Sequence, residues 1–281
     1  MRVKSYEIFK IDEWPKSRSD AEVKAMEKGH DTLLCLNKFG KFCGRSPIGT
    51  WCVGIPEDYY KAANFIYYEN THSRSVVIWS ENYEIALRIF QQLKEHKGRM
   101  YKDLENSKFL CHSTPIENFK NILKDKSLLS YIQLMSDGKM INTVRFELKE
   151  PDDYLDYIDF CPCESISSEI VVASRQFGKI NDNSDIIYKP GVRIYFKSDK
   201  LQKVEGACFD GLHTFIVYKK LSLSYAEAFV FVSKNYVEAI KKDNNISEDI
   251  KKKFFCLESR EYWTPNEFIN KANDLVFSQI G

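Results

Sequence analysis

The stretch FLCHSTPIENFKNIL, residues 109–123, constrains the fold more than any other part of the sequence. Its apolar start is typical of a strand, and the apolar positions that follow repeat at helical spacing. Thr114 is a good N-cap, Pro115 suits the first helical position, and Glu117 completes a capping box. The junction therefore predicts that His112 ends a strand directly before a helix N-terminus, where unpaired N–H groups favour an anionic ligand.

A second strand is predicted over LSYAEAFVFV, where side chains alternate between two faces. Glu227 is the single acid between Leu221 and Val237. A carboxylate that loses its water without gaining a partner is strongly disfavoured. The residues alone leave two readings open, a strand that meets water or a carboxylate kept for a function. The predicted alternation gives one face to Leu223, Tyr225, Glu227, Phe229 and Phe231.

Residues 1–105 are expected to form a separate, small α+β domain of unassigned role. A helix capped by Ser80 is expected after its strands. The polar sequence at 71–74 is interpreted as an exposed turn rather than a catalytic cluster, and His30 and His96 lie in equally polar surroundings. Strands are expected at 32–36, 50–54, 64–68 and 75–79.

Composition describes an ordinary globular protein, with 43% hydrophobic and 29% charged residues. Lys and Arg number 41 against 40 Asp and Glu, so nucleic-acid binding would need a local basic patch. No apolar run is long enough for a signal peptide or a membrane span, which leads us to expect a cytoplasmic protein. The eight cysteines are expected to be reduced thiols, and Cys161 and Cys163 are too close in sequence for the usual zinc ligand pair, so no metal is predicted.

Four segments, in the same order over about 130 residues, resemble the DarT-type nucleic-acid ADP-ribosyltransferases. GVRIYFKSDKL is similar to the family strand before the substrate loop, and Ala226-Glu227 matches the catalytic strand. The opening NAD-binding segment is matched at His112, Thr114, Ile116, Asn118, Phe119, Ile122 and Leu123. An Asp-Tyr segment is matched at Asp156, Tyr157, Ile158 and Phe160.

The resemblance implies an α+β, ADP-ribosyltransferase-like fold with split mixed or antiparallel sheets and flanking helices over 106–240, followed by a helical extension at 241–281. NAD would be the ADP-ribose donor, with no metal. Glu227 would be the catalytic residue, stabilising the positively charged sugar that forms as the nicotinamide bond breaks. The cofactor would be bound by His112, Thr114, Asn118, Arg145 and Tyr157.

The acceptor is less clearly indicated. The family turn that carries an arginine after the Asp-Tyr segment is replaced here by CPCESISSEIVV, so Arg175 is the substitute candidate. The segment from Lys189 to Lys220 contains seven basic and three acidic residues. This excess of positive charge suits either a nucleic-acid groove or a solvated surface. The predicted substrate-binding residues, most of them in the loop at about 204–223, are His213, Phe215, Tyr218 and Arg175.

Three functions therefore stay open. The leading one is NAD-dependent modification of a base in single-stranded DNA or RNA by a toxin or phage-defence effector. The partners would be that nucleic acid and an antitoxin or phage protein bound by the N-terminal domain, with no membrane. The alternatives are ADP-ribosylation of a protein side chain and a non-catalytic module that binds or senses NAD.

Overall fold

The computed structural model describes residues 6–37, 41–45, 51–95, 107–139, 152–181, 183–211, 214–257 and 260–280. The chain divides into two compact units, each with its own sheet and hydrophobic core. Unit 1 comprises Met1–Asp103, Lys149–Asp152 and Cys208–Thr214. Unit 2 comprises Leu104–Leu148, Asp153–Ala207 and Phe215–Gly281.

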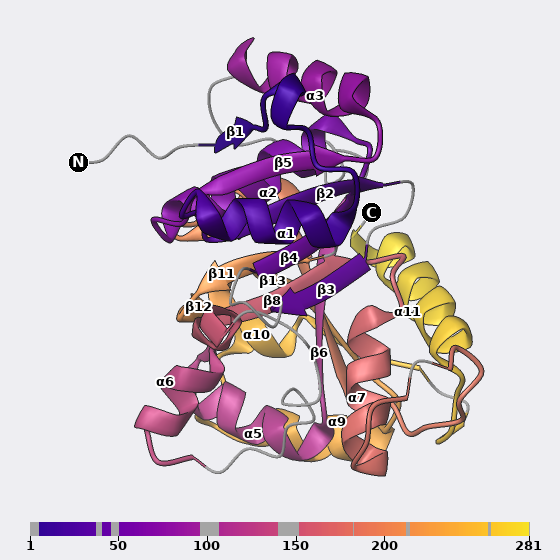
Figure 1. Ribbon diagram of the computed structural model, residues 1–281. Helices are drawn as coiled ribbons and strands as arrows, with labels where there is room; N and C mark the ends of the chain where they lie inside the picture. The colour runs from indigo at the N-terminus through magenta and orange to yellow at the C-terminus, as the bar shows by residue number, and fades with distance from the viewer. Residues whose placement is uncertain are drawn as a thin grey trace. The chain divides into compact units, whose positions relative to one another are not determined.

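Unit 1 is a five-stranded sheet covered by helices on both faces (Figure 1). The strands stand in the order β1-β5-β2-β4-β3, and all neighbours are parallel except β3 and β4. The elements are β1 (Tyr6–Ile8), α1 (Arg18–Glu27), β2 (Thr32–Asn37), β3 (Lys41–Arg45), β4 (Trp51–Pro56), α2 (Tyr59–Thr71), β5 (Val76–Ser80) and α3 (Tyr83–Glu95).

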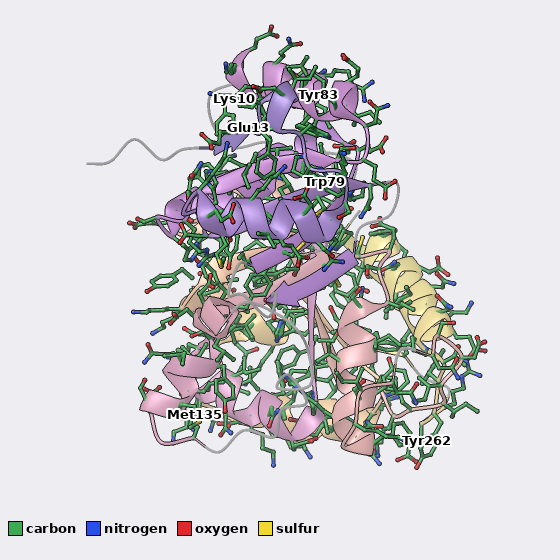
Figure 2. The ribbon with its side chains drawn as sticks, viewed as in Figure 1. Lys10, Glu13, Trp79, Tyr83, Met135 and Tyr262 are labelled. Carbon is green, nitrogen blue, oxygen red and sulfur yellow. The ribbon has the colours of Figure 1, made fainter. Side chains whose placement is uncertain are left out.

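Alternate residues of β2 divide the core of unit 1 between the two faces. Leu33 packs with α1, whereas Leu34 packs with α2 and α3. Trp79 of β5 holds the connection from β1 to α1, because it donates its ring N–H to the Pro15 carbonyl at 3.1 Å. Trp79 and the nearby Tyr83 are labelled in Figure 2.

The predicted strand at 64–68 is wrong, because these residues lie inside α2. Asp58 caps this helix by accepting from the backbone N–H groups of Tyr60 and Lys61. Almost every residue of its second and third turns is buried, and a helix buried on most sides has the same continuous apolar sequence as a buried strand. Unit 1 consequently alternates strands and helices around a mainly parallel sheet, which differs from the α+β domain expected for 1–105.

The predicted helix after residue 80 is present as α3, with a different cap. The side chain of Asn82, the residue before the helix, accepts from the Glu84 N–H. The Ser80 hydroxyl instead accepts from the Asn82 N–H, outside the helix. The side of this helix that is buried contains Ala86, Ile89 and Leu93.

Unit 2 is built on a seven-stranded mixed sheet in the order β10-β11-β8-β6-β9-β13-β14, with a separate two-stranded ribbon of β12 and β7. The α+β class predicted for this part of the chain is confirmed. Its strands are β6 (Phe109–Thr114), β7 (Ser127–Leu129), β8 (Tyr157–Pro162), β9 (Val192–Lys197), β10 (Ala207–Phe209), β11 (Phe215–Tyr218), β12 (Lys220–Ser222), β13 (Ala226–Phe231) and β14 (Phe254–Cys256). Its α-helices are α5 (Ile116–Asp125), α6 (Tyr131–Ser136), α7 (Ser167–Phe177), α8 (Ser198–Leu201), α9 (Lys234–Lys241), α10 (Glu248–Lys251) and α11 (Pro265–Ile280).

The sheet of unit 2 is split at β8. Residues 157–160 of this strand pair with β11, and only Cys161 and Pro162 pair with β6. Beyond Cys111 and Cys161 the backbones of β6 and β8 are no longer paired, although both strands continue. This divergence opens the sheet between the end of β6 and the start of β8.

The two faces of the β6-β9-β13 region have different coverings. One face packs α7 and α11 against Cys111, Tyr195 and Val230. On the other face, Phe119 of α5 is fully buried against an aromatic cluster of Phe229, Phe231 and Phe254, with ring centroids 5.4 to 6.2 Å from it. The segment 241–281, predicted as a helical extension, contains α11 but also adds β14 to the edge of the sheet.

Candidate active site

A pocket of unit 2 lies where β6 and β8 diverge. It encloses about 930 Å³, counting its open mouth. His112 and Thr114 line it from β6, Asn118 from α5 and Tyr157 from β8. Four of the five residues predicted to bind the cofactor, from three separate segments, thus line one pocket. The fifth, Arg145, lies outside the described residues.

His112 is fixed in the pocket by a hydrogen bond to the backbone of the diverging strand. Its Nδ1 lies 2.9 Å from the carbonyl oxygen of Asp159. A carbonyl can only accept, so Nδ1 carries the proton and Nε2 is left with its lone pair. Burial lowers the pKa of His112 to about 4, and the positive charge of Arg175 adds to this lowering, while the bond to Asp159 opposes it. The imidazole is therefore neutral at physiological pH.

Two cationic side chains also line the pocket. Arg175 comes from α7, and its charge acts on His112. Lys139, which follows α6, forms ion pairs with Asp125 and, at 3.8 Å, with Asp137. Cations suit a ligand that carries phosphates, and Asp125 and Asp159 line the same pocket. The sequence indicated Arg175 as an acceptor-binding residue, whereas the structure brings it to the predicted cofactor residues.

Thr114 faces the pocket instead of capping α5. β6 extends through Thr114, the N-cap position of α5 falls on Pro115, and no side chain accepts a capping hydrogen bond there. The predicted capping box is therefore wrong. A close contact with Gly191 accounts for the position of Thr114: a Cβ on Gly191 would lie 1.9 Å from the Thr114 carbonyl oxygen, so only glycine permits this approach.

Glu227 lies near the start of β13, within an irregularity of the strand. Ala226 is opposite Phe196 and Ala228 is opposite Tyr195, so Glu227 is the extra residue of a bulge. Bulges are frequent next to active sites because they redirect a side chain. The bulge also ends the alternation predicted across this segment, and residues 223–225, expected in the strand, form a 3-10 turn.

The carboxylate of Glu227 is ion-paired to Lys200 of α8, with Oε1 and Nζ 2.5 Å apart. The Glu227 side chain is 19% exposed and that of Lys200 is 50% exposed. This hydrogen bond, with the charge of Glu227, raises the pKa of Lys200. Glu227 is thus a partly accessible carboxylate with one defined partner.

His112 and Glu227 lie on strands separated by β9 alone. His112 is opposite Ile194, and Ile194 is opposite Phe229 of β13. Two strand spacings of about 4.8 Å separate β6 from β13, so the two strands are roughly 10 Å apart across the sheet. Glu227 lies two residues along β13 from Phe229, the position level with His112. Glu227 is not among the described residues that line the His112 pocket.

The predicted acceptor residues are dispersed. Phe215 is fully buried in β11, with its ring 6.4 Å from that of Phe160, so it cannot stack on an acceptor base. Tyr218 ends the same strand, is 43% exposed and has the ammonium of Lys219 over its ring at 4.9 Å. The predicted loop at 204–223 contains β10, β11 and β12. His213 lies outside the described residues.

Several pocket residues were missed by the sequence analysis. Asn121 and Asp125 follow Asn118 along one side of α5, and Tyr131 and Leu134 enter from α6. Met135, labelled in Figure 2, continues α6 and is 52% exposed. The i+3 and i+7 spacing from Asn118 was the available signal for the two α5 residues. Nothing in the sequence pointed to α6, because its approach depends on the turn after β7.

The histidine and arginine of the 71–74 sequence have local partners in unit 1. Arg74 makes a two-pronged ion pair with the buried Glu69, and its guanidinium lies 5.4 Å from the Tyr68 ring centre. His72 Nδ1 is 2.8 Å from the Tyr68 carbonyl. These contacts hold the turn after α2.

Within the described ranges, no group of three or more His, Cys, Asp or Glu side chains is arranged to hold a metal ion. Cys161 and Cys163 are buried separate thiols, and the Cys161 sulfur lies 2.7 Å from the Ser168 hydroxyl. Among the helices that the structure describes, none has the length and apolar character needed to cross a bilayer.

No family model and no curated protein matches the sequence. The structure is similar to solved structures of Thermus sp. 2.9 DarT. The complex with carba-NAD+ is 16% identical, covers 56% of this chain and 99% of that chain, and has a TM-score of 0.34. The complex with ADP-ribosylated ssDNA is 16% identical, covers 48% of this chain and 87% of that chain, and has a TM-score of 0.33. The complex with NAD+ is 17% identical, covers 49% of this chain and 88% of that chain, and has a TM-score of 0.33.

Proposed function

We propose that this protein is an NAD-dependent ADP-ribosyltransferase that modifies a base of single-stranded DNA or RNA. One observation carries the proposal: His112, Thr114, Asn118 and Tyr157, which the family resemblance assigns to the cofactor, line a single pocket. Tyr157 of β8 lies about 45 positions after His112 of β6 in the sequence. The two residues meet where the pairing of β6 with β8 ends. A chance resemblance gives no reason for them to meet.

The neutral His112 would hold the donor. Its Nδ1–H is used by the Asp159 carbonyl, so Nε2 can accept from a ribose hydroxyl. Arg175 and Lys139 would face the diphosphate. NAD would thereby be bound through its sugar and phosphates without an additional metal.

Glu227 would act on the ribose from β13, which is separated from β6 by β9 alone. Cleavage of the bond between ribose C1′ and nicotinamide leaves a positively charged sugar, and a carboxylate stabilises that charge. Nicotinamide departs with the bonding electron pair, and a base nitrogen forms the new bond to C1′ and loses its proton. Lys200, ion-paired to Glu227 in the structure, would orient the carboxylate in the free protein.

We infer that the protein acts in the cytoplasm as a toxin or phage-defence effector, with residues 1–105 as a domain that an antitoxin or phage protein could bind. The family resemblance supports this role. Expression of the wild type and of Glu227→Gln in a bacterial host tests it. Growth arrest with the wild type only is expected, whereas equal growth of both contradicts a toxic activity.

The enzymatic proposal is tested by incubating the purified protein with NAD and single-stranded oligonucleotides of varied sequence. Mass spectrometry should detect the addition of one ADP-ribose and the release of nicotinamide. A parallel incubation with cell protein covers the alternative acceptor. Addition to protein alone would contradict the nucleic-acid assignment and favour a protein side chain.

A non-catalytic NAD-binding or sensing module is the second candidate, and the surroundings of Glu227 favour it. This carboxylate is neutralised by Lys200 and is absent from the described lining of the His112 pocket. Calorimetry that detects NAD binding, without release of nicotinamide in the presence of any acceptor, would establish this candidate and exclude the enzyme.

A further inference from the structure

A second pocket of unit 2 lies beside the His112 pocket. It encloses about 1,080 Å³, counting its open mouth. Its walls come from the end of α5, from the segment of β12 and the following 3-10 turn, and from the region of α10. Figure 1 labels α5, β12 and α10. All of these elements belong to unit 2.

The end of α5 and the β7-β12 ribbon form a common wall between the two pockets. Ile122 and Asp125 line the His112 pocket, whereas Leu123 and Lys126 line the second one. The Lys126 carbonyl accepts from the Leu223 N–H at 3.0 Å, which ties the wall to the turn before β13. A ligand in the second pocket would therefore be a close neighbour of one in the first.

The lining of the second pocket combines apolar, neutral polar and cationic side chains. Leu123, Leu223 and Ile246 supply apolar surface, and Lys126 and Lys253 supply positive charge. Among the described residues of the lining, the single acid is Asp249, which is 3.8 Å from the ammonium of Lys252. A nucleotide has the complementary pattern, since its base and sugar offer flat apolar surface and its phosphate carries negative charge.

The second pocket adjoins the strand that carries Glu227. The ammonium of Lys253 donates to the carbonyl of Ala226, the residue directly before Glu227. Ser224 lines the pocket, and the next residue, Tyr225, is 38% exposed. An exposed tyrosine beside a cationic pocket can stack on a base of a single strand whose backbone follows the lysines.

We propose that this second pocket binds one nucleotide of the acceptor strand, next to the base that is presented to Glu227. Its base and sugar lie against Leu123, Leu223 and Ile246, and its phosphate is held by Lys126 and Lys253. The inference rests on the proposed function for the identity of the ligand. It adds a specific site, since the recognition of the strand would depend on residues outside the NAD pocket.

The test is the binding of fluorescein-labelled, single-stranded DNA and RNA oligonucleotides of mixed sequence, measured by anisotropy over a range of salt concentrations without NAD. Lys126→Gln should weaken binding roughly fivefold and lower the slope of log affinity against log salt by about 0.7, the value for one phosphate on a single strand. Lys124→Gln is the matched control, because this exposed lysine is two positions away on α5 and does not line the pocket.

Equal losses in Lys126→Gln and Lys124→Gln, or no oligonucleotide binding by the wild type, would overturn the inference. It would equally be overturned if adenosine monophosphate alone bound with Lys126 dependence and neither oligonucleotide did. These binding outcomes are independent of chemistry. ADP-ribose transfer with no effect of Lys126 on binding removes the pocket and keeps the enzyme, whereas Lys126-dependent binding without transfer keeps the pocket and removes the enzyme.

Discussion

The Nδ1 atom of His112 lies 2.9 Å from the carbonyl oxygen of Asp159, across the point where β6 and β8 separate. The backbone ladder of these strands ends at Cys111 and Cys161, and Asp159 lies beyond that end on β8. The hydrogen bond from the imidazole ring to the Asp159 carbonyl fixes the ring at the mouth of the split. The geometry of the candidate cofactor site thus follows from where the sheet stops being paired.

Titration of His112 should make the protein less stable in mild acid. The pKa of about 4 in the folded state lies below the value of roughly 6.5 for an unfolded chain. As the pH falls, the unfolded state binds a proton first, so the free energy of unfolding is unaffected above about pH 6.5 and falls by up to about 3 kcal/mol toward pH 4. Urea unfolding of the wild type should show this loss, and His112→Gln should lack it. An NMR titration of the ring with a midpoint near 6.5 would contradict the account.

Replacing Arg175 should change both the donor affinity and the titration of His112. The charge of Arg175 contributes to the lowered pKa of His112, so Arg175→Gln should raise that pKa while burial still keeps it below the usual value. The same change should weaken NAD binding by roughly tenfold if the guanidinium contacts a phosphate. Calorimetry and NMR measure the two effects. An altered pKa with unaltered affinity would separate Arg175 from the ligand.

The buried pair of Glu169 and Arg193 should contribute strongly to the stability of unit 2. Both side chains are fully buried, with a charged oxygen and nitrogen 2.8 Å apart, and Tyr188 donates to the same carboxylate at 2.6 Å. Arg193→Met should lower the free energy of unfolding by about 3–5 kcal/mol, because it leaves the carboxylate buried without its counter-charge.

The double variant Arg193→Met/Glu169→Met should recover part of that loss, since no unpaired charge remains. Chemical unfolding of both single variants and the double variant completes the cycle. A loss below about 1 kcal/mol for Arg193→Met alone would mean that water reaches the carboxylate and that the pair is not sealed in the core.

Gly191→Ala should damage the pocket, although Gly191 is not itself a predicted ligand-binding residue. The added methyl would meet the Thr114 carbonyl at 1.9 Å, so the end of β6 must move. We expect a loss of about 1–3 kcal/mol in stability, as for other overpacked sites, together with weaker NAD binding. Ile187→Ala in the same connection is the control, because Ile187 is 65% exposed. Wild-type affinity in Gly191→Ala would show that Thr114 does not position the donor.

The sequence was sufficient to predict the strand-to-helix junction at His112 and the α+β class of unit 2. These features rest on local patterns, since apolar periodicity and a Pro at a helix start act within a few residues. The grouping of His112 with Tyr157 was available only through the family resemblance. Local periodicity does not specify which strands pair or where a pairing ends.

The failures have tertiary causes. Residues 64–68 form a helix because Asp58 caps it and both the sheet and α3 bury it, which sequence alternation cannot distinguish from a strand. The bulge at Glu227 depends on the register with β9, so the predicted alternation could not reveal it. Phe215, predicted to meet the acceptor, is buried because its segment joins the sheet beside β8.

The central claim is that the carboxylate of Glu227 drives transfer of ADP-ribose from a donor held near His112. The most direct measurement compares single-turnover transfer to an oligonucleotide by the wild type, Glu227→Gln and Lys200→Gln. Both substitutions break the ion pair, but only Glu227→Gln removes the carboxylate. We predict that Glu227→Gln lowers the rate at least about 100-fold with an unchanged melting temperature, and that Lys200→Gln retains most of the rate. Transfer by Glu227→Gln at the wild-type rate would contradict the account.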